Sequence, residues 1–541
     1  LNDIGSQEKR YMTEKLYEWQ EECIDRWFAN DGRGIVQAVT GSGKTLLALT
    51  AMDCMDQKLN RSLHIKIVVP TSALMRQWKQ SLLDYLSVSC QNLPPAGNDY
   101  AASLHTDPVR NMIGLRGGGS KASPDHKYMI YVINSARYEL ARQILTELRR
   151  GENVLLIADE CHHYESEQNQ LIFEFLPYIK ECDGQFFSLG LTATLPSGQA
   201  RRYLTSVLGR KIYHYGMKEA SDGNTICPYD VYHISLSLHA DERDEYEELT
   251  EQMTILYATL LKVYPSLKSL TQKERFEALR SLAGSKNRKI AKAASSYMGL
   301  TFMRKRLVCL AEARITCACD LLKRLDTKEK IIIFGERISQ ADELYRLLQA
   351  DYPERVGRYH SKMGNQANRN ALERFRTGSI RILIACKAID EGLDVPDASI
   401  GIILSGTSTQ RQRIQRLGRI IRKQSSKDRA ALYYLHIADT SEDSCYLPDS
   451  EEHRLFELAY NDQLKQFDNP VYDIKAAALL AEMEYDTNPE LLKEVTRCLH
   501  LGCVRSDWTL TKDELNARIQ SARYTSEKNY WVCMKRLYSL S

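Results

Sequence analysis

A short glycine-rich stretch, AVTGSGKT at residues 38–45, limits the fold and chemistry of this chain more than any other segment. An apolar run precedes it and an Ala- and Leu-rich segment follows it, which predicts a strand, a loop and a helix in that order. Small residues let consecutive backbone N–H groups face phosphate oxygens, and the helix N-terminus adds partial positive charge. The stretch therefore predicts a nucleotide site, although Ala38 occupies a position where the general pattern has glycine. The predicted nucleotide-binding residues are Thr40, Gly41, Ser42, Gly43, Lys44, which would neutralise phosphate, and Thr45, which would ligate Mg²⁺.

The hydrophobic pattern predicts two α/β units. From about residue 16 to 222, short apolar runs alternate with helical stretches, and the same rhythm returns over 330–437. Runs that are apolar on both faces indicate parallel sheets covered by helices. Residues 240–324 are dense in Glu, Lys, Arg and Leu and indicate a helical insert. We expect a first α/β domain over 1–225, a helical insert and connector over 226–325, a second α/β domain over 326–440 and a helical C-terminal region over 441–541.

Two carboxylates end the apolar run 154–158. Asp159 would hold Mg²⁺ through water, and Glu160 would orient and deprotonate an attacking water. The alternative is a strand-end turn with solvated acids, but the phosphate loop upstream favours the nucleotide reading.

Further polar residues follow the same pattern of strand ends. Thr192 and Thr194, after the run 186–191, would pass a hydrogen bond between the nucleotide site and the second unit. Hydroxyls satisfied within a local turn are the alternative. We expect His162 to take part in the same coupling.

The second unit carries a basic segment over 411–422. On a helix, Gln415, Arg419 and Arg422 share one face, and a planar guanidinium suits the charge that spreads over a transferring phosphate. A solvated basic helix face is the alternative. Upstream, Gly392 and Asp394 follow an apolar run and would meet the ribose and the water shell of the metal.

The order of these segments resembles that of superfamily 2 helicases and translocases, over roughly residues 12–440. The pieces that carry the resemblance are the glutamine motif ending at Gln20, TGSGKT, VVPTSALMRQW, DECH, TAT, IIIFGERI, ACKAIDEGLDVPDA and QRLGRIIR. The run from Tyr359 to Arg422 is most similar to the XPB-like branch. The resemblance implies the α/β class with two RecA-like parallel-sheet domains that close on ATP while nucleic acid lies across both.

The resemblance also implies residue roles. Gln20 would read adenine, Gly392 and Asp394 would help to close the site, and Arg419 and Arg422 would act as arginine fingers. Three departures are present. Many relatives have Arg and Pro shortly before the glutamine, where this chain reads Tyr17-Glu18-Trp19. The family usually has Ser or Thr at Cys386, and XPB proteins carry Arg-Glu-Asp where this chain has residues 195–198. The resemblance implies nucleic-acid contacts in both units. They are Pro70 and Thr71, Asn134 and Ser135, the segment Gly335-Glu336-Arg337, of which Arg337 is the candidate side chain, and Cys386.

We therefore expect an ATP- and Mg²⁺-dependent DNA helicase or duplex translocase, with repair or defence against foreign DNA as its setting. The net charge of +3 requires local clusters for nucleic-acid binding, and contacts mostly to phosphate are expected. The resemblance to the XPB-like branch implies DNA more than RNA. We expect an intracellular protein, cytoplasmic or nucleoid-associated, with no membrane partner. The alternative is an ATP-switched nucleic-acid sensor or a subunit of a larger nuclease or defence complex. In that reading the C-terminal region recruits a protein partner and the acidic stretch 441–463 is a docking surface rather than a solvated linker.

Overall fold

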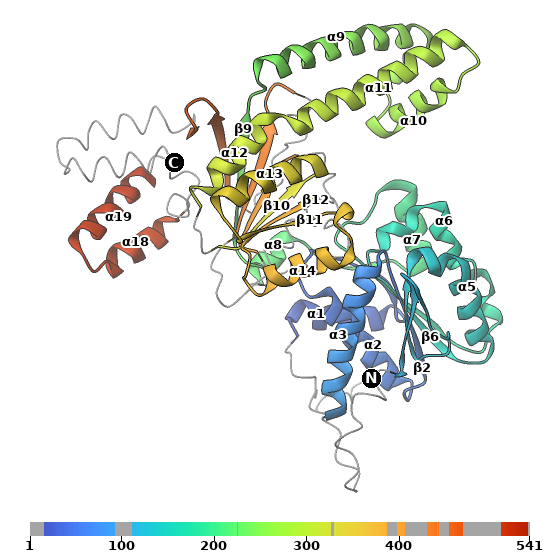
Figure 1. Cartoon of the computed structure of the whole chain (residues 1–541). Helices are drawn as coiled ribbons and strands as arrows, with labels where there is room; N and C mark the ends of the chain where they lie inside the picture. Colours follow the sequence, from blue (N-terminus) through green and yellow to red (C-terminus); the bar gives the residue numbers. More distant parts are fainter. Residues whose placement is uncertain are drawn as a thin grey trace. The chain divides into compact units, whose positions relative to one another are not determined.

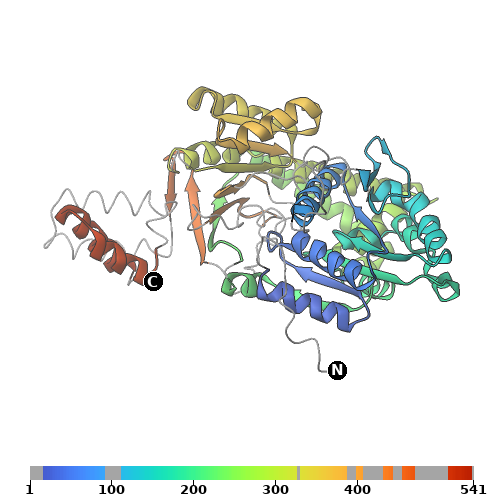
Figure 2. The ribbon, with the colours of Figure 1, turned by 90° about the horizontal axis from the view of Figure 1, so that it is seen from below.

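The computed structural model describes residues 16–91, 111–223, 225–325, 329–386, 398–405, 430–440, 442, 454–468 and 510–538. These residues form two compact units, which meet along the chain at Pro228 and Tyr229 (Figures 1 and 2). Five predicted site residues lie outside the described residues: Gly392, Asp394, Gln415, Arg419 and Arg422. Among the described residues, no helix is both long and apolar enough to cross a membrane.

The first unit is an eight-stranded sheet in the order β4-β3-β5-β2-β6-β7-β1-β8. All its pairs are parallel except β3 with β4. Its strands are β1 (Arg33–Ala38), β2 (Leu63–Val69), β3 (Ile113–Gly117), β4 (Ser120–Lys121), β5 (Tyr128–Val132), β6 (Asn153–Ala158), β7 (Phe186–Thr192) and β8 (Lys211–Tyr215).

Helices cover both faces of this sheet (Figure 1). One face carries α1 (Glu18–Ala29), α2 (Lys44–Lys58) and α3 (Ser72–Gln91), and the other carries α5 (Ile133–Arg149), α6 (Glu167–Gln170) and α7 (Gly198–Leu208). The short helices η1 (Cys161–Glu165), η2 (Leu171–Phe173), η3 (Leu176–Glu181) and α8 (Met217–Asp222) complete the unit. Every residue of β5 and β7 is buried, because both faces of these central strands are covered. The predicted helix-covered parallel sheet is confirmed.

The second unit contains another eight-stranded sheet, in the order β11-β12-β10-β13-β14-β9-β15-β16, with only β15 and β16 antiparallel. Its strands are β9 (Tyr229–Leu236), β10 (Ile331–Gly335), β11 (Val356–Tyr359), β12 (Ile382–Cys386), β13 (Ile400–Ile403), β14 (Ala430–Ile437), β15 (Arg454–Asn461) and β16 (Gln466–Asp468). Its further helices are α12 (Glu312–Leu322), α13 (Ile338–Asp351), η5 (Ser361–Met363) and α14 (Asn365–Arg376).

The predicted helical insert is an arm of this unit (Figure 1). It consists of α9 (Ala240–Val263), η4 (Pro265–Lys268), α10 (Gln272–Ala283) and α11 (Arg288–Leu310). The arm has a small core of its own, formed by Leu260, Leu267, Leu279, Ala293 and Ala294. Near the end of the chain, α18 (Lys512–Ser521) packs against α19 (Thr525–Tyr538).

Three strands correct the secondary structure expected from the sequence. We expected a helical region from residue 441, but β15 and β16 lie there and extend the second sheet. The expected insert and connector likewise contains β9, which pairs with both β14 and β15. A stack of rings across the three strands explains the pairing: Tyr232 lies 4.6 Å from Tyr433 and 5.0 Å from Phe456, centroid to centroid.

Part of the acidic stretch 441–463 is packed into the second unit. Glu442 is buried and accepts hydrogen bonds from the Arg314 guanidinium and the Ile437 backbone N–H. The reading of 441–463 as a solvated linker is therefore wrong at Glu442 and over β15.

Candidate nucleotide and nucleic-acid site

Five neighbouring strands of the first sheet end in the residues that the sequence singled out. Their order is β5-β2-β6-β7-β1, and all are parallel, so their carboxyl ends meet at one edge of the sheet. The phosphate loop follows β1, Asp159 follows β6, and the threonine pair lies at the end of β7 between them. The candidate nucleic-acid residues follow β2 and β5, on the other side of β6. The fold thus gathers every predicted site residue of this unit at one edge, except Gln20, which comes from α1.

The phosphate loop has the backbone that its glycines allow. Gly41 and Gly43 have φ angles of +90° and +93°, in the left-handed region, and α2 begins at Lys44. The Lys44 ammonium donates to the backbone oxygens of Ala38 at 2.9 Å and Val39 at 3.1 Å. The Thr40 hydroxyl oxygen is buried and has no hydrogen-bond partner among the described residues. A cation, an unsatisfied hydroxyl and a helix N-terminus together fit a bound phosphate.

Gln20 is connected directly to this loop. Its side chain is fully buried, its amide nitrogen donates to the Gly43 carbonyl at 2.9 Å, and its oxygen accepts the Tyr17 N–H at 2.9 Å. A Cβ on Gly43 would lie 2.7 Å from that amide nitrogen, so this position also requires glycine for space. One amide hydrogen and one oxygen lone pair of Gln20 remain for the predicted contact with adenine.

The two carboxylates after β6 are held in different ways. Asp159 is buried; its Oδ2 accepts the Trp78 indole N–H at 2.8 Å and its Oδ1 accepts the Glu160 backbone N–H at 2.9 Å. Burial raises the pKa of Asp159, while the Trp78 hydrogen bond and the Lys44 charge act to lower that pKa. Glu160 has a left-handed backbone with φ +46° and ψ +51°, which is uncommon for a residue with a Cβ and typical of functional sites.

The predicted coupling residues contact one another. His162 Nδ1 lies 3.0 Å from the Thr192 hydroxyl, which donates to the Thr194 carbonyl at 2.9 Å and lies 3.2 Å from the Thr194 N–H. His162 Nδ1 also lies 3.3 Å from a Glu160 carboxylate oxygen. The His162 imidazole thus lies between the Glu160 carboxylate, which follows β6, and Thr192 at the end of β7.

The predicted nucleic-acid residues of the first unit lie at the starts of two helices. Pro70 and Thr71 are half-buried before α3, while Asn134 and Ser135 lie in the first turn of α5 and Asn134 is exposed. The glycine turn after β3 touches both segments: a Cβ on Gly117 would lie 3.0 Å from the Ser135 hydroxyl oxygen, and one on Gly118 would lie 2.8 Å from Ser72 Cβ.

The predicted nucleic-acid residues of the second unit lie beside each other at the edge of the second sheet. Gly335 pairs with Cys386 at the ends of β10 and β12, and Arg337 follows β10. Cys386 is buried, with 3% of the residue's surface exposed, whereas Arg337 is half-buried. Arg337 is therefore the more accessible of these two residues at this edge.

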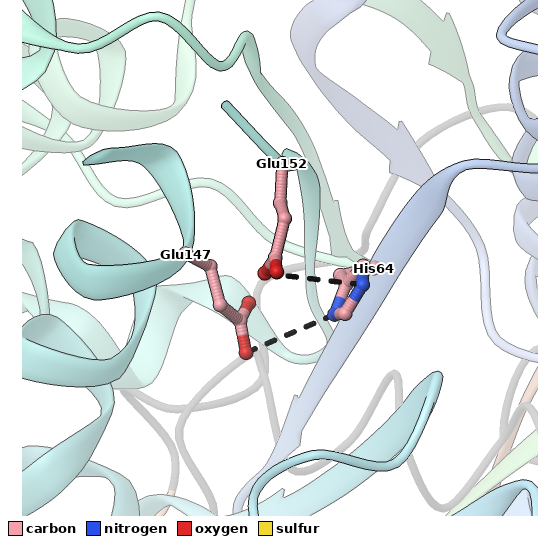
Figure 3. A group of neighbouring side chains, drawn as sticks. All are labelled: His64, Glu147 and Glu152. Carbon is pink, nitrogen blue, oxygen red and sulfur yellow. Dashed lines mark ion pairs between the residues drawn. The ribbon is translucent and has the colours of Figure 1, made fainter. Parts of the chain in front are cut away.

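A second polar cluster lies at the opposite, amino-terminal edge of the first sheet. There the two ring nitrogens of His64 each face a different carboxylate, Glu147 and Glu152, at 3.9 Å (Figure 3). Glu147 also receives the buried Lys66 ammonium at 2.7 Å. Because each nitrogen faces its own carboxylate and Lys66 already contacts Glu147, the arrangement suits ion pairing better than one shared metal ion.

Trp78 contacts one of the predicted site residues, and sequence reasoning did not single it out. It lies within VVPTSALMRQW, but only the fold shows that its indole reaches a carboxylate 81 residues further along the chain. A tryptophan in an amphipathic helix gives no sequence signal of such a contact.

Comparison with known proteins matches two family models in order along the chain. Residues 13–197 match the type III restriction enzyme res subunit, and residues 313–424 match the helicase conserved C-terminal domain. The chain is 28% identical over 423 residues to the DNA 3'-5' translocase XPB2 of Sulfurisphaera tokodaii, covering 77% of this chain and 80% of that protein. It is 24% identical over 440 residues to the DNA 3'-5' helicase XPB of Kineococcus radiotolerans, covering 79% of this chain but only 60% of that protein.

The sequence identity to solved structures is lower than the identity to these two relatives. The helicase domain of Pyrococcus furiosus Hef gives a TM-score of 0.47 at 16% identity, covering 80% of this chain and 97% of that chain. The fold assignment comes from the two sheet topologies, and the family assignment comes from the matched domains and relatives. Taken together, the two matched domains and the two relatives support an ATP-hydrolysing helicase or translocase of superfamily 2 with XPB-like affinity.

Proposed function

We propose that this helicase uses Mg²⁺ and ATP to move along DNA, as a duplex translocase or a strand-separating enzyme. One observation carries the proposal: the loop with Lys44 and the carboxylates Asp159 and Glu160 end two strands at the same edge of one parallel sheet. The two XPB relatives are described as acting on DNA with 3'-5' polarity, which favours DNA over RNA.

Each residue of this edge has a role that its surroundings support. Lys44 would exchange its two carbonyl acceptors for phosphate oxygens, since the ammonium already lies inside the loop. Thr45 and Asp159 would hold the Mg²⁺ that balances the phosphate charge. Glu160, placed by its left-handed backbone, would orient and deprotonate the attacking water. Gln20 would position the loop through Gly43 as well as read adenine.

We further propose that the segments between β12 and β14 complete the reaction. Arg419 and Arg422 would stabilise the transferring phosphate, Gln415 would support them from the same helix face, and Gly392 with Asp394 would help to close the site. Nucleic acid would contact the segments after β2 and β5 in the first unit and after β10 and β12 in the second. Those contacts would go mainly to phosphate, so binding would weaken steeply with salt and depend little on sequence.

Two variants test this assignment. Lys44→Ala should abolish ATP hydrolysis, whereas Lys58→Ala at the other end of α2 should hydrolyse ATP at the wild-type rate. Glu160→Gln should bind ATP and DNA together without turnover, because it keeps the shape of the side chain and removes the base. Near-normal hydrolysis by either Lys44→Ala or Glu160→Gln would contradict the assignment.

A further inference from the structure

We infer that Trp78 is a positioning residue that connects the predicted nucleic-acid segment at Pro70-Thr71 with the carboxylate of Asp159. The inference rests on the proposed function, since it takes Asp159 as the Mg²⁺ carboxylate. Trp78 itself touches neither phosphate nor metal in this account; it acts through Asp159.

The first step of the argument is the hydrogen bond itself. Trp78 is 1% exposed, and its indole N–H meets Asp159 Oδ2 at 2.8 Å in a place without bulk solvent. An indole N–H only donates and does not ionise in the physiological range, so this contact persists whatever the charge of the carboxylate. Buried carboxylates that hold metals are oriented by such outer partners, whose loss typically weakens metal binding about 10- to 100-fold.

The second step is that both oxygens of Asp159 are fixed. Oδ1 accepts the backbone N–H of Glu160, so the plane of the carboxylate is set from two sides. Removing the indole donor would leave Oδ2 buried without that donor and free the carboxylate to rotate about its backbone-held oxygen. The orientation of the Asp159 carboxylate therefore depends on Trp78.

The third step is the connection to α3. Thr71 directly precedes this helix; its hydroxyl oxygen accepts the Leu74 N–H at 3.3 Å, and its carbonyl accepts the Met75 N–H at 3.0 Å. Trp78 lies about two helical turns further along the same helix. A nucleic acid that shifts the Pro70-Thr71 end of α3 would therefore move the indole that holds Asp159.

The chain offers a matched control. Trp27 of α1 is also 1% exposed, and its indole N–H also donates within the first unit, to the Ser188 backbone oxygen at 3.0 Å. Trp78→Phe and Trp27→Phe thus each remove one buried indole donor while keeping an aromatic ring. Only the first changes a group at the nucleotide edge. Trp78→Tyr serves as a second variant that fills more of the indole space.

The experiment measures metal binding without turnover. Full-length wild type, Trp78→Phe, Trp78→Tyr and Trp27→Phe are titrated with Mn²⁺ in the presence of a non-hydrolysable ATP analogue, and free Mn²⁺ is followed by electron paramagnetic resonance. We expect the Mn²⁺ Kd to rise about tenfold or more in both Trp78 variants and to stay within about twofold of wild type in Trp27→Phe. Thermal unfolding of the four proteins shows whether any variant has lost its fold.

A second readout concerns the connection to nucleic acid. The fold-stimulation of ATP hydrolysis by duplex DNA should fall in the Trp78 variants and remain in Trp27→Phe. Folded Trp78 variants with wild-type Mn²⁺ affinity, or a loss that Trp27→Phe shares, would overturn the inference. A wild-type chain that no nucleic acid stimulates would overturn the proposed action on DNA, and the Mn²⁺ titration would still decide whether Trp78 positions Asp159.

Discussion

A buried ion pair beneath α5 allows a stability prediction of known size. Lys66 lies in the middle of β2 with none of its surface exposed, and its ammonium contacts Glu147 Oε1 at 2.7 Å. Gln143 donates to the same oxygen at 2.9 Å, while Glu147 Oε2 is buried with no hydrogen-bond partner among the described residues. Burial lowers the pKa of Lys66, and Glu147 is the main charge that opposes this shift. The pair is therefore a costly arrangement in which each charge depends on the other.

Replacing Lys66 with Met keeps an unbranched side chain that is one heavy atom shorter and leaves the Glu147 charge buried without its cation. Breaking such a pair from one side typically costs about 3–5 kcal/mol. His64 lies 3.9 Å from Glu147 and Gln143 still donates to it, so we expect a cost near the lower end, about 3 kcal/mol. The double variant Lys66→Met/Glu147→Leu should recover most of this loss, because it removes both charges and fills the space with apolar atoms.

The assay is urea unfolding of the full chain followed by tryptophan fluorescence, since three of the five tryptophans lie in the first unit. The exposed pair Arg26–Glu22 is the control, and Arg26→Met should change the free energy of unfolding far less than Lys66→Met does, because solvent screens exposed charges. The reasoning would be refuted if Lys66→Met cost less than about 1 kcal/mol, or if the double variant were no more stable than the single one.

Three further predictions concern other contacts. Gln20→Ala removes two buried hydrogen bonds at the phosphate loop and should weaken ATP affinity about tenfold, measured with a fluorescent nucleotide; unchanged affinity would exclude a role for this side chain. Arg314→Met leaves Glu442 buried and unpaired and should destabilise the second unit by about 3–5 kcal/mol in urea unfolding; a cost below about 1 kcal/mol would contradict the importance of this pair. The hydrogen bond that the His239 ring donates to the Asp462 carboxylate raises the pKa of His239, so the stabilisation from this pair is complete below about pH 6.5 and is lost as pH rises through the raised value. Because the two side chains are still 33% and 30% exposed, solvent screens the pair and the effect should stay below about 1 kcal/mol. Asp462→Asn should reduce the pH dependence of stability over that range, since it removes the largest cause of the raised pKa; an unchanged profile would refute the linkage.

Local sequence was sufficient for the elements whose pattern is continuous. The runs that became β5, β6 and β7 are apolar on both faces, which is the signature of central parallel strands. The positions of the phosphate loop and of the carboxylates at strand ends could be predicted, because the apolar runs before them mark the strands that they follow. The parallel order of the strands then brought them to one edge.

Contacts between distant residues could not be predicted in this way. Trp78 with Asp159 and Lys66 with Glu147 are each separated by 81 residues, and no local pattern links either pair. β15 was missed because its buried residues alternate with more exposed ones within an acidic segment. The segment therefore has the composition of a polar region, and its strand pattern was not recognised. Its place in the sheet depends on ring stacking with β9, more than two hundred residues earlier.

The central claim is that ATP hydrolysis at the edge carrying Lys44 and Glu160 drives movement on DNA. The most direct test is the ATP hydrolysis rate of the full chain with matched single-stranded DNA, double-stranded DNA and RNA, each at two salt concentrations. We predict strong stimulation by duplex DNA that declines at the higher salt, as expected for phosphate contacts. Stimulation by RNA alone, or by none of the three, would contradict the claim.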